Sequence, residues 1–208
     1  MKVGVIGAGT MGQGIAKAFA QVDGYEVALC DIKQEWAEGG KDKIAKGYAR
    51  LVQKGKMTQE QVDGILASIT PGIKEDLCAD CDLIVEAAFE NMEVKKTTFG
   101  ELDKICKPEC IFASNTSSLS ITEIGNGLTR PMIGMHFFNP AYKSLTLFDE
   151  YRHTGFCGRV ALFEKGHIFY KCLNGKSCVT HTLDKLNGFA GILVIVTQTA
   201  LCSRNRRQ

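Results

Sequence analysis

Residues 3–12 read Val-Gly-Val-Ile-Gly-Ala-Gly-Thr-Met-Gly, and this stretch decides the fold. Its first four residues are short and apolar, which is typical of a strand buried in a parallel sheet. Small and apolar residues follow at helical spacing over 16–20, and residues 26–30 read as a second strand that ends at Asp31. A strand, a helix and a strand within about 30 residues predict a βαβ unit.

The glycines of this stretch form a G-x-G-x-x-G motif between the first strand and the helix. In such a motif Gly7 permits the tight turn, Gly9 lets the backbone approach a pyrophosphate, and Gly12 allows close packing of helix on strand. Free N–H groups at the start of the helix favour an anion. The candidate cofactor-binding residues here are Gly7, Gly9, Thr10, Met11 and Gly12.

Asp31 extends the motif. It lies about 20 residues beyond the glycines, at the end of the second strand, where an acidic residue binds a ribose 2′-hydroxyl. A carboxylate at this place repels a 2′-phosphate. The sequence therefore predicts NAD, in preference to NADP, as the cofactor.

The segment that follows the second strand reads as two helices. Residues 34–54 carry one apolar stripe, and Thr58 with Gln61 forms a capping-box pattern that opens a second helix, which Pro71-Gly72 ends. We expect a helical hairpin over 34–68 that projects from the sheet.

Strands and helices then alternate again. Strand patterns occur at 83–85, 111–113 and 133–135, and helical patterns at 91–105 and 121–124. This alternation predicts an α/β fold of the Rossmann type, with a doubly wound, mostly parallel sheet over residues 1–140.

Beyond Pro140 the character of the chain changes. Residues 141–208 have a net charge of +6, whereas residues 1–140 have a net charge of −4. No regular period runs through 141–187, and the apolar segment 189–202 is shorter than the ~20 residues of a membrane span. We expect 141–208 to be an irregular, atypical tail, either frameshifted or fused to the first domain.

The net charge, the N-terminal residues and the cysteine content indicate which binding partners and which cellular compartment to expect. The net charge of +2 is too small to suggest a nucleic-acid surface, and no membrane partner is expected. The N-terminus has no secretory pattern, and nine cysteines, an odd number, indicate free thiols in a cytoplasmic protein. Cys78 and Cys81 have C-x-x-C form, but a second ligand pair is missing, so no metal site is predicted.

Three further stretches give the sequence a resemblance. Residues 85–91 read Val-Glu-Ala-Ala-Phe-Glu-Asn and lead to Lys95, residues 114–119 read Ser-Asn-Thr-Ser-Ser-Leu, and residues 135–140 read Met-His-Phe-Phe-Asn-Pro. In this order behind the glycine motif, they resemble the 3-hydroxyacyl-CoA dehydrogenases, most closely the short bacterial 3-hydroxybutyryl-CoA dehydrogenases. The similarity covers residues 1 to about 141.

The resemblance implies NAD-dependent oxidation of a 3-hydroxyacyl-CoA in fatty acid and butyrate metabolism. His136 would be the general base, and Ser117 would hydrogen-bond the substrate oxygen near the nicotinamide. Glu90 and Lys95 would contact the ribose region of the cofactor, and Asn139 would seat the nicotinamide end. The helical hairpin would face the CoA nucleotide, with Lys54 either on a phosphate or simply solvated.

The chain also departs from the family. Position 148 is Phe, where the resemblance implies the glutamate that orients the histidine, and it stays open whether Asp149 or Glu150 replaces it. The C-terminal helical domain of these homo-oligomeric enzymes, with its catalytic Asn and dimer interface, is not recognisable. The alternative hypothesis is therefore a catalytically inactive NAD-binding fragment.

Overall fold

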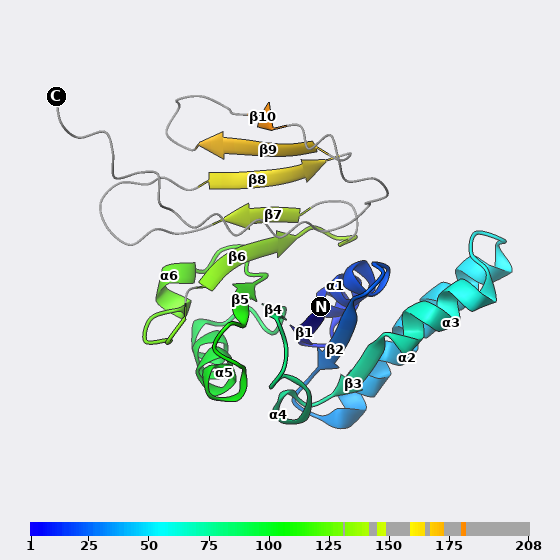
Figure 1. Cartoon of the computed structure of the whole chain (residues 1–208), viewed down its shortest axis with the longest axis horizontal. Helices are drawn as coiled ribbons and strands as arrows, with labels where there is room; N and C mark the ends of the chain where they lie inside the picture. Colours follow the sequence, from blue (N-terminus) through cyan, green and yellow to red (C-terminus); the bar gives the residue numbers. More distant parts are fainter. Residues whose placement is uncertain (131, 142–144, 149–158, 165–166, 173–179, 182–208) are drawn as a thin grey trace.

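The computed structural model describes residues 1–130, 132–141, 145–148, 159–164, 167–172 and 180–181 (Figure 1). Its strands form one sheet in the order β10-β9-β8-β7-β6-β5-β4-β1-β2-β3. The strands are β1 Lys2–Ile6, β2 Glu26–Cys30, β3 Ile69–Gly72, β4 Leu83–Glu86, β5 Ile111–Ser114, β6 Met132–Phe137, β7 Leu145–Phe148, β8 Arg159–Glu164, β9 His167–Cys172 and β10 Thr180–His181.

The first six strands are all parallel and confirm the predicted doubly wound sheet. Their order, 3-2-1-4-5-6, brings the ends of β1 and β4 together where the direction of winding reverses. Val3 of β1 lies between Val27 of β2 and Leu83 of β4. These side chains are almost fully buried because helices cover both faces, which explains the continuous apolar runs in the sequence.

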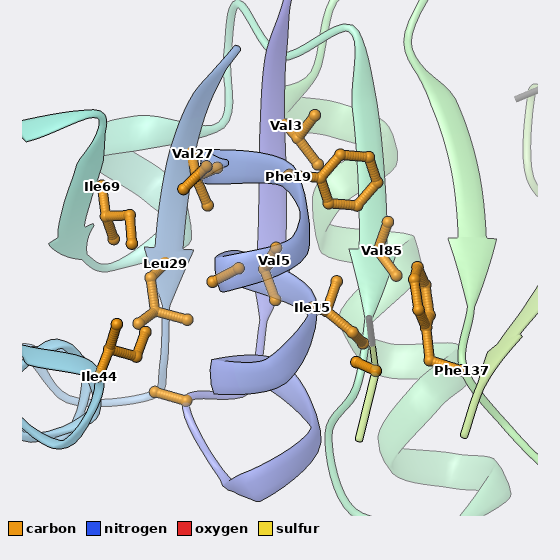
Figure 2. Packing of buried hydrophobic residues seen from close by; sticks show 14 of the residues in the cluster. Val3, Val5, Ile15, Phe19, Val27, Leu29, Ile44, Ile69, Val85 and Phe137 are labelled. Atoms are coloured by element: carbon orange, nitrogen blue, oxygen red, sulfur yellow. The ribbon is translucent and has the colours of Figure 1, made fainter. Parts of the chain in front are cut away.

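The helices are α1 Thr10–Ala20, α2 Gln34–Gln53, α3 Gln59–Ala67, α4 Lys74–Leu77, α5 Met92–Ile105 and α6 Ile121–Ile124. One face of the sheet packs against α1, α2 and α3, where Ile15 and Phe19 contact the valines of β1 (Figure 2). The other face packs against α5 through Phe99 and Leu102, and against α6 through Ile121 and Ile124.

The predicted helical hairpin is formed by α2 and α3, which extend away from the sheet (Figure 1). The capping box is confirmed, since the Gln61 N–H donates to Thr58 Oγ1 and the Thr58 N–H donates to Gln61 Oε1. Only four residues of α2 are buried, and Tyr48, among them, accepts a hydrogen bond from Gln21. The hairpin is therefore attached to the domain mainly through the first part of α2 and Tyr48.

The strand β3 was not predicted, because Pro71 and Gly72 were interpreted as the end of a helix. In the structure, β3 pairs only with β2 among the described strands, with Pro71 opposite Leu29. A proline lacks the N–H that a central strand needs, but an edge strand tolerates it.

The prediction of an irregular tail is wrong for residues 145–148, 159–164, 167–172 and 180–181, which form β7 to β10. β7 pairs antiparallel with β6, and the later strands add antiparallel to β7. Residues 159–164 and 167–172 are rich in β-branched and aromatic residues and are separated by Lys165-Gly166 in the sequence, which is a hairpin pattern. The apolar segment 189–202 lies outside the described residues.

The cysteines of the C-x-x-C motif are buried free thiols, as predicted. Cys78 and Cys81 pack into the core beneath α5, and the Sγ atoms of Cys30 and Cys78 lie 3.7 Å apart. These thiols fill the core between the sheet and its helices.

Candidate active site

The glycine turn after β1 has the sterics that the motif predicted. Gly7 has a φ of +101°, and a Cβ there would lie 2.8 Å from the carbonyl oxygen of Ala87. A Cβ at Gly12 would lie 1.7 Å from the carbonyl oxygen of Gly7. At Gly9, by contrast, a Cβ would meet no atom of the described residues within 4 Å. Gly7 and Gly12 are therefore required by the turn itself, while Gly9 borders open space that suits a bound pyrophosphate.

The start of α1 offers an anion site beside this space. Gly9 is the N-cap of α1 and has no side chain to satisfy the first N–H groups of the helix. The carboxylate of Asp31, at the end of β2, accepts hydrogen bonds from the N–H groups of Ala8 (2.7 Å) and Ile32 (2.8 Å). The residues present therefore fit a dinucleotide, with Asp31 held against the turn.

His136 lies on β6, beside the loop that follows β5. Its Nδ1 atom is 3.0 Å from the carbonyl oxygen of Asn115, and its ring contacts the edge of Phe138. The side chain is only half-buried. The contact at Nδ1 leaves Nε2 as the ring nitrogen that can exchange a proton with a substrate.

Glu90 holds the loop that carries Ser117. Its Oε1 accepts hydrogen bonds from Thr116 Oγ1 (2.6 Å), the Ser117 N–H (3.0 Å) and Ser118 Oγ (3.3 Å). Burial acts to raise the pKa of Glu90, but the hydrogen bonds from Thr116 and Ser117 and the charge of Lys95 outweigh it and hold the pKa below its usual value. Glu90 is therefore an ionised anchor for the loop, and the Ser117 side chain is exposed.

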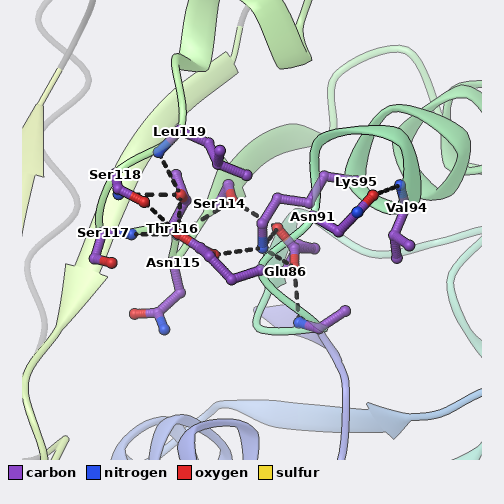
Figure 3. A network of polar contacts seen from close by, with 12 residues as sticks. Glu86, Asn91, Val94, Lys95, Ser114, Asn115, Thr116, Ser117, Ser118 and Leu119 are labelled. Atoms are coloured by element: carbon purple, nitrogen blue, oxygen red, sulfur yellow. Dashed lines mark hydrogen bonds and ion pairs between the residues drawn. The ribbon is translucent and has the colours of Figure 1, made fainter.

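Glu86 and Lys95 form a buried ion pair next to Glu90 (Figure 3). Lys95 Nζ lies 2.7 and 2.9 Å from the carboxylate oxygens of Glu86 and 3.3 Å from Glu90 Oε2. Glu86 also accepts hydrogen bonds from Ser114 Oγ (2.5 Å) and the Ala88 N–H (2.7 Å). The network thus ties the ends of β4 and β5 to the first turns of α5.

Residues 2–147 match the family model described as the NAD-binding domain of 3-hydroxyacyl-CoA dehydrogenase. The chain belongs to this family. NAD is therefore the cofactor of the domain, in agreement with the glycine turn and Asp31. The predicted family and the predicted Rossmann-type sheet are both confirmed.

A curated relative and a solved structure similar to this chain are both named 3-hydroxybutyryl-CoA dehydrogenases. The chain is 47% identical over 142 residues to a probable 3-hydroxybutyryl-CoA dehydrogenase of Deinococcus radiodurans, covering 67% of this chain and 50% of the relative. The crystal structure of (S)-3-hydroxybutyryl-CoA dehydrogenase from Ralstonia eutropha matches with a TM-score of 0.65 and 40% identity, over 70% of this chain and 53% of that one. The chain thus spans about half the length of these relatives.

A third likeness is to the alpha subunit of the fatty acid oxidation complex of Idiomarina loihiensis. The two are 42% identical over 142 residues, which is 67% of this chain and 20% of that subunit. The dehydrogenase family therefore includes proteins of different overall length that share this domain.

Not all of the predicted site residues of this dehydrogenase domain lie together. The glycine turn, Asp31, Glu90, Ser117 and His136 all lie at or just after the carboxyl ends of parallel strands, at one edge of the sheet. Thr10 opens α1 and Met11 packs on the core, while Asn139 is exposed just after β6. Lys95 is fully buried behind the edge, where its ammonium holds Glu86 and Glu90. Lys54 is the exposed C-cap of α2 on the hairpin.

Two residues of the site were not singled out from the sequence, namely Glu86 and Asn115. Glu86 ends an otherwise apolar strand, and a charge at such a position requires a buried partner, which is a usable signal. Asn115 contacts His136 through its backbone carbonyl oxygen. Every residue has such an oxygen, so the residue type at position 115 does not predict the contact.

The residues that the structure describes contain neither a candidate metal cluster nor a helix that could span a membrane. Among them, no group of three or more His, Cys, Asp or Glu side chains is arranged to hold a metal ion. No helix in this part of the chain is long and apolar enough to cross a membrane. Asp149 and Glu150, the possible replacements for the orienting acid, lie outside the described residues.

Proposed function

We propose that this chain is an NAD-dependent 3-hydroxyacyl-CoA dehydrogenase that acts on short substrates of the 3-hydroxybutyryl-CoA type, in fatty acid and butyrate metabolism. The observation that carries the proposal is that one edge of the sheet holds the glycine turn, the Ser117 loop and His136. The names of the relatives support the same substrate class.

The residues of this edge have separate tasks. Gly9 and the start of α1 bind the pyrophosphate, and Asp31 accepts hydrogen bonds from the adenosine ribose. Glu90 serves the ribose region of the nicotinamide half, and Lys95, buried behind it, holds the Glu90 carboxylate in place. Asn139 borders the nicotinamide ring. When bound, the nicotinamide supplies the acceptor for a hydride.

At the substrate, the secondary alcohol loses a proton from its hydroxyl group and a hydride from C3. Ser117 binds the 3-hydroxyl oxygen, and His136 Nε2 takes the hydroxyl proton as the hydride leaves C3, so that a 3-oxoacyl-CoA forms. An imidazole suits this task because its two ring nitrogens can accept and release a proton near neutral pH. In the reverse direction His136 returns the proton to the oxygen.

The hairpin and the thiols complete the proposal. Lys54 lies on an exposed helix end, where an ammonium can bind a phosphate of CoA. We assign the protein to the cytoplasm, which the five free cysteines of the described residues support, because a reducing compartment keeps thiols free.

A second candidate is NAD binding without turnover. It is favoured by Phe148, which stands where the resemblance implies a glutamate that orients the histidine. Without such a group, a histidine loses control of its tautomer and orientation.

The deciding experiment measures NADH oxidation by the full chain with acetoacetyl-CoA, together with NADH binding. We expect turnover, and His136→Gln should lower kcat by roughly 10²- to 10⁴-fold while NADH binding is retained. A chain that binds NADH but leaves acetoacetyl-CoA unchanged would favour the second candidate. A chain that does not bind NADH would contradict both.

A further inference from the structure

Asn115 is held at three points where the ends of three strands meet. Its N–H donates to the carbonyl oxygen of Glu86 on β4 (2.7 Å), and its side-chain Oδ1 accepts from the Phe137 N–H on β6 (2.7 Å). Its own carbonyl oxygen lies 3.0 Å from His136 Nδ1. Asn115 itself follows β5 directly. The residue therefore fixes the position of one carbonyl oxygen relative to the histidine ring.

This contact determines the protonation of the ring. A backbone carbonyl oxygen can only accept a hydrogen bond, so Nδ1 must carry the hydrogen. A neutral imidazole has a single N–H, and the other nitrogen is then an acceptor. The geometry therefore selects the form in which Nε2 of His136 has a free lone pair.

The orientation of the ring follows from the same residue. The Oδ1 bond to Phe137 fixes the backbone next to His136, while the Glu86 bond fixes the backbone of Asn115 itself. Both partners lie on strands of the sheet. The carbonyl oxygen of Asn115 is therefore fixed in position. If the His136 ring rotated, the hydrogen bond at Nδ1 would be lost, and this loss favours the observed ring orientation.

In the family pattern, the residue that contacts the histidine ring would stand at position 148, on the neighbouring strand β7. In this chain the side chain at that position does not supply the hydrogen-bond acceptor for Nδ1 of His136. β7 pairs His136 with Thr146, and it pairs Phe148 with Gly134. The side chain of a phenylalanine has no polar atom, so at position 148 it cannot accept a hydrogen from Nδ1 as a carboxylate would. Among the described residues, the oxygen placed at Nδ1 is that of Asn115.

We infer that Asn115 is the positioning residue of His136: its clamped carbonyl oxygen holds the Nδ1–H tautomer and leaves Nε2 as the base. The inference rests on the proposed function and deepens it. Unlike a carboxylate, a carbonyl oxygen carries no net charge, so it directs the proton without forming an ion pair with the imidazolium. One hydrogen bond of about 1 kcal/mol corresponds to a roughly fivefold preference between tautomers.

The test reads the tautomer directly in the full chain. Long-range ¹H–¹⁵N NMR of the ¹⁵N-labelled protein, at a pH where the ring is neutral, distinguishes a protonated from an unprotonated ring nitrogen. The signal of His136 is the one missing from His136→Gln. We expect the Nδ1–H form to predominate, and the Nε2–H form as the main species would overturn the inference.

Variants then separate positioning from general structure. Asn115→Ala removes the Oδ1 acceptor of the Phe137 N–H, and we expect the Nδ1–H preference to fall by roughly fivefold. Asn115→Asp keeps that acceptor and should restore the preference. Asn126→Ala, which removes an exposed amide beyond α6, is the matched control and should leave the tautomer unchanged. An unchanged tautomer in Asn115→Ala would overturn the role of its side chain.

NADH binding and turnover are measured on the same samples. In an active chain, Asn115→Ala should lower kcat while the Kd for NADH stays within about twofold. A chain that lacks turnover but shows the Nδ1–H form contradicts the proposed function and supports this inference. A chain that shows turnover but has the Nε2–H form supports the proposed function and contradicts this inference.

Discussion

The ammonium of Lys95 lies 2.7 Å from one carboxylate oxygen of Glu86 and 2.9 Å from the other, and the two side chains are 1% and 0% exposed. A charge buried to this degree requires a partner, and each of these residues is the main partner of the other. Because Glu86 ends β4 and Lys95 lies on α5, the pair fixes the helix to the sheet beneath the Ser117 loop.

The first prediction concerns this pair. Lys95→Met leaves the Glu86 carboxylate buried without its cation and should lower the free energy of unfolding by about 3–5 kcal/mol. The neighbouring Lys96 pairs with Glu123 on the surface, so Lys96→Met is the matched control and should cost about 1 kcal/mol or less. Urea denaturation measures both. Equal effects of the two substitutions would contradict the structural role of the buried pair.

A double variant that removes both charges of the Glu86–Lys95 pair tests whether the unpaired carboxylate is what destabilises Lys95→Met. Glu86→Gln with Lys95→Met removes both charges. The amide oxygen can still accept from the Ala88 N–H, and the amide NH2 can donate to Ser114 Oγ, which accepts as well as donates. We expect the double variant to be more stable than Lys95→Met alone, because no uncompensated charge remains buried.

The second prediction concerns pH. Asp103 accepts hydrogen bonds from the Thr129 N–H and hydroxyl and from Arg130 Nε. Burial acts to raise its pKa, but these bonds and the guanidinium outweigh burial and hold the pKa below the usual value. A lowered pKa in the folded state stabilises the protein above the pKa of the unfolded state, about 3.9, and this stability is lost as the pH falls below it.

Asp103→Asn should therefore be less stable than the wild type by about 1–3 kcal/mol at neutral pH, and the gap should narrow below about pH 4. Unfolding midpoints measured across this range give the comparison. Asp42→Asn removes an exposed carboxylate of α2 and is the control. A gap that stays constant in acid would contradict the role of the charge.

The third prediction separates the two glycines of the turn. Gly12→Ala places a Cβ 1.7 Å from the Gly7 carbonyl oxygen, so the turn must shift, and both stability and NADH binding should be lost. Gly9→Ala meets no described atom within 4 Å and has an ordinary φ of −72°, so the fold should be unaffected. NADH binding should nevertheless weaken at least tenfold, because the methyl group occupies the approach of the pyrophosphate.

Gly39→Ala is a control for the glycine substitutions. It lies in α2, where an added Cβ also meets no atom of the described residues within 4 Å, and should stabilise the helix by up to about 1 kcal/mol without changing NADH binding. NADH affinity in Gly9→Ala equal to that of the wild type would contradict a pyrophosphate over Gly9.

The fold was predictable where periodicity and glycine spacing determine it. The parallel strands other than β3 and the capping box at Thr58 and Gln61 lie where the sequence pattern placed them. β3 was missed because a proline argues against a strand unless the strand is known to lie at an edge. The strands after residue 145 were missed although residues 159–172 carry a local hairpin pattern, because no regular period runs through 141–187. The pairing of β7 with β6 joins the hairpin to the sheet, and a local pattern does not reveal that pairing.

The site was predictable to the extent that side-chain type carries its chemistry. His136, Ser117 and Glu90 are polar residues next to strand ends, and the resemblance gave each a role. The task of Asn115 depends on a backbone oxygen, and the link of Glu86 to Lys95 depends on two elements meeting in space. Neither relationship is encoded in a spacing that the sequence displays.

The last prediction concerns the hairpin. If Lys54 binds a phosphate of CoA, Lys54→Ala should raise the KM for acetoacetyl-CoA by about two- to fivefold, the effect of losing an exposed ion pair of up to about 1 kcal/mol. The Kd for NADH should not change, because the hairpin extends away from the glycine turn (Figure 1). Lys46→Ala removes another exposed lysine of α2 and is the matched control. Added salt should raise the wild-type KM toward that of Lys54→Ala, since salt screens exposed charges. Equal KM values for Lys54→Ala and Lys46→Ala would mean that Lys54 is simply a solvated lysine.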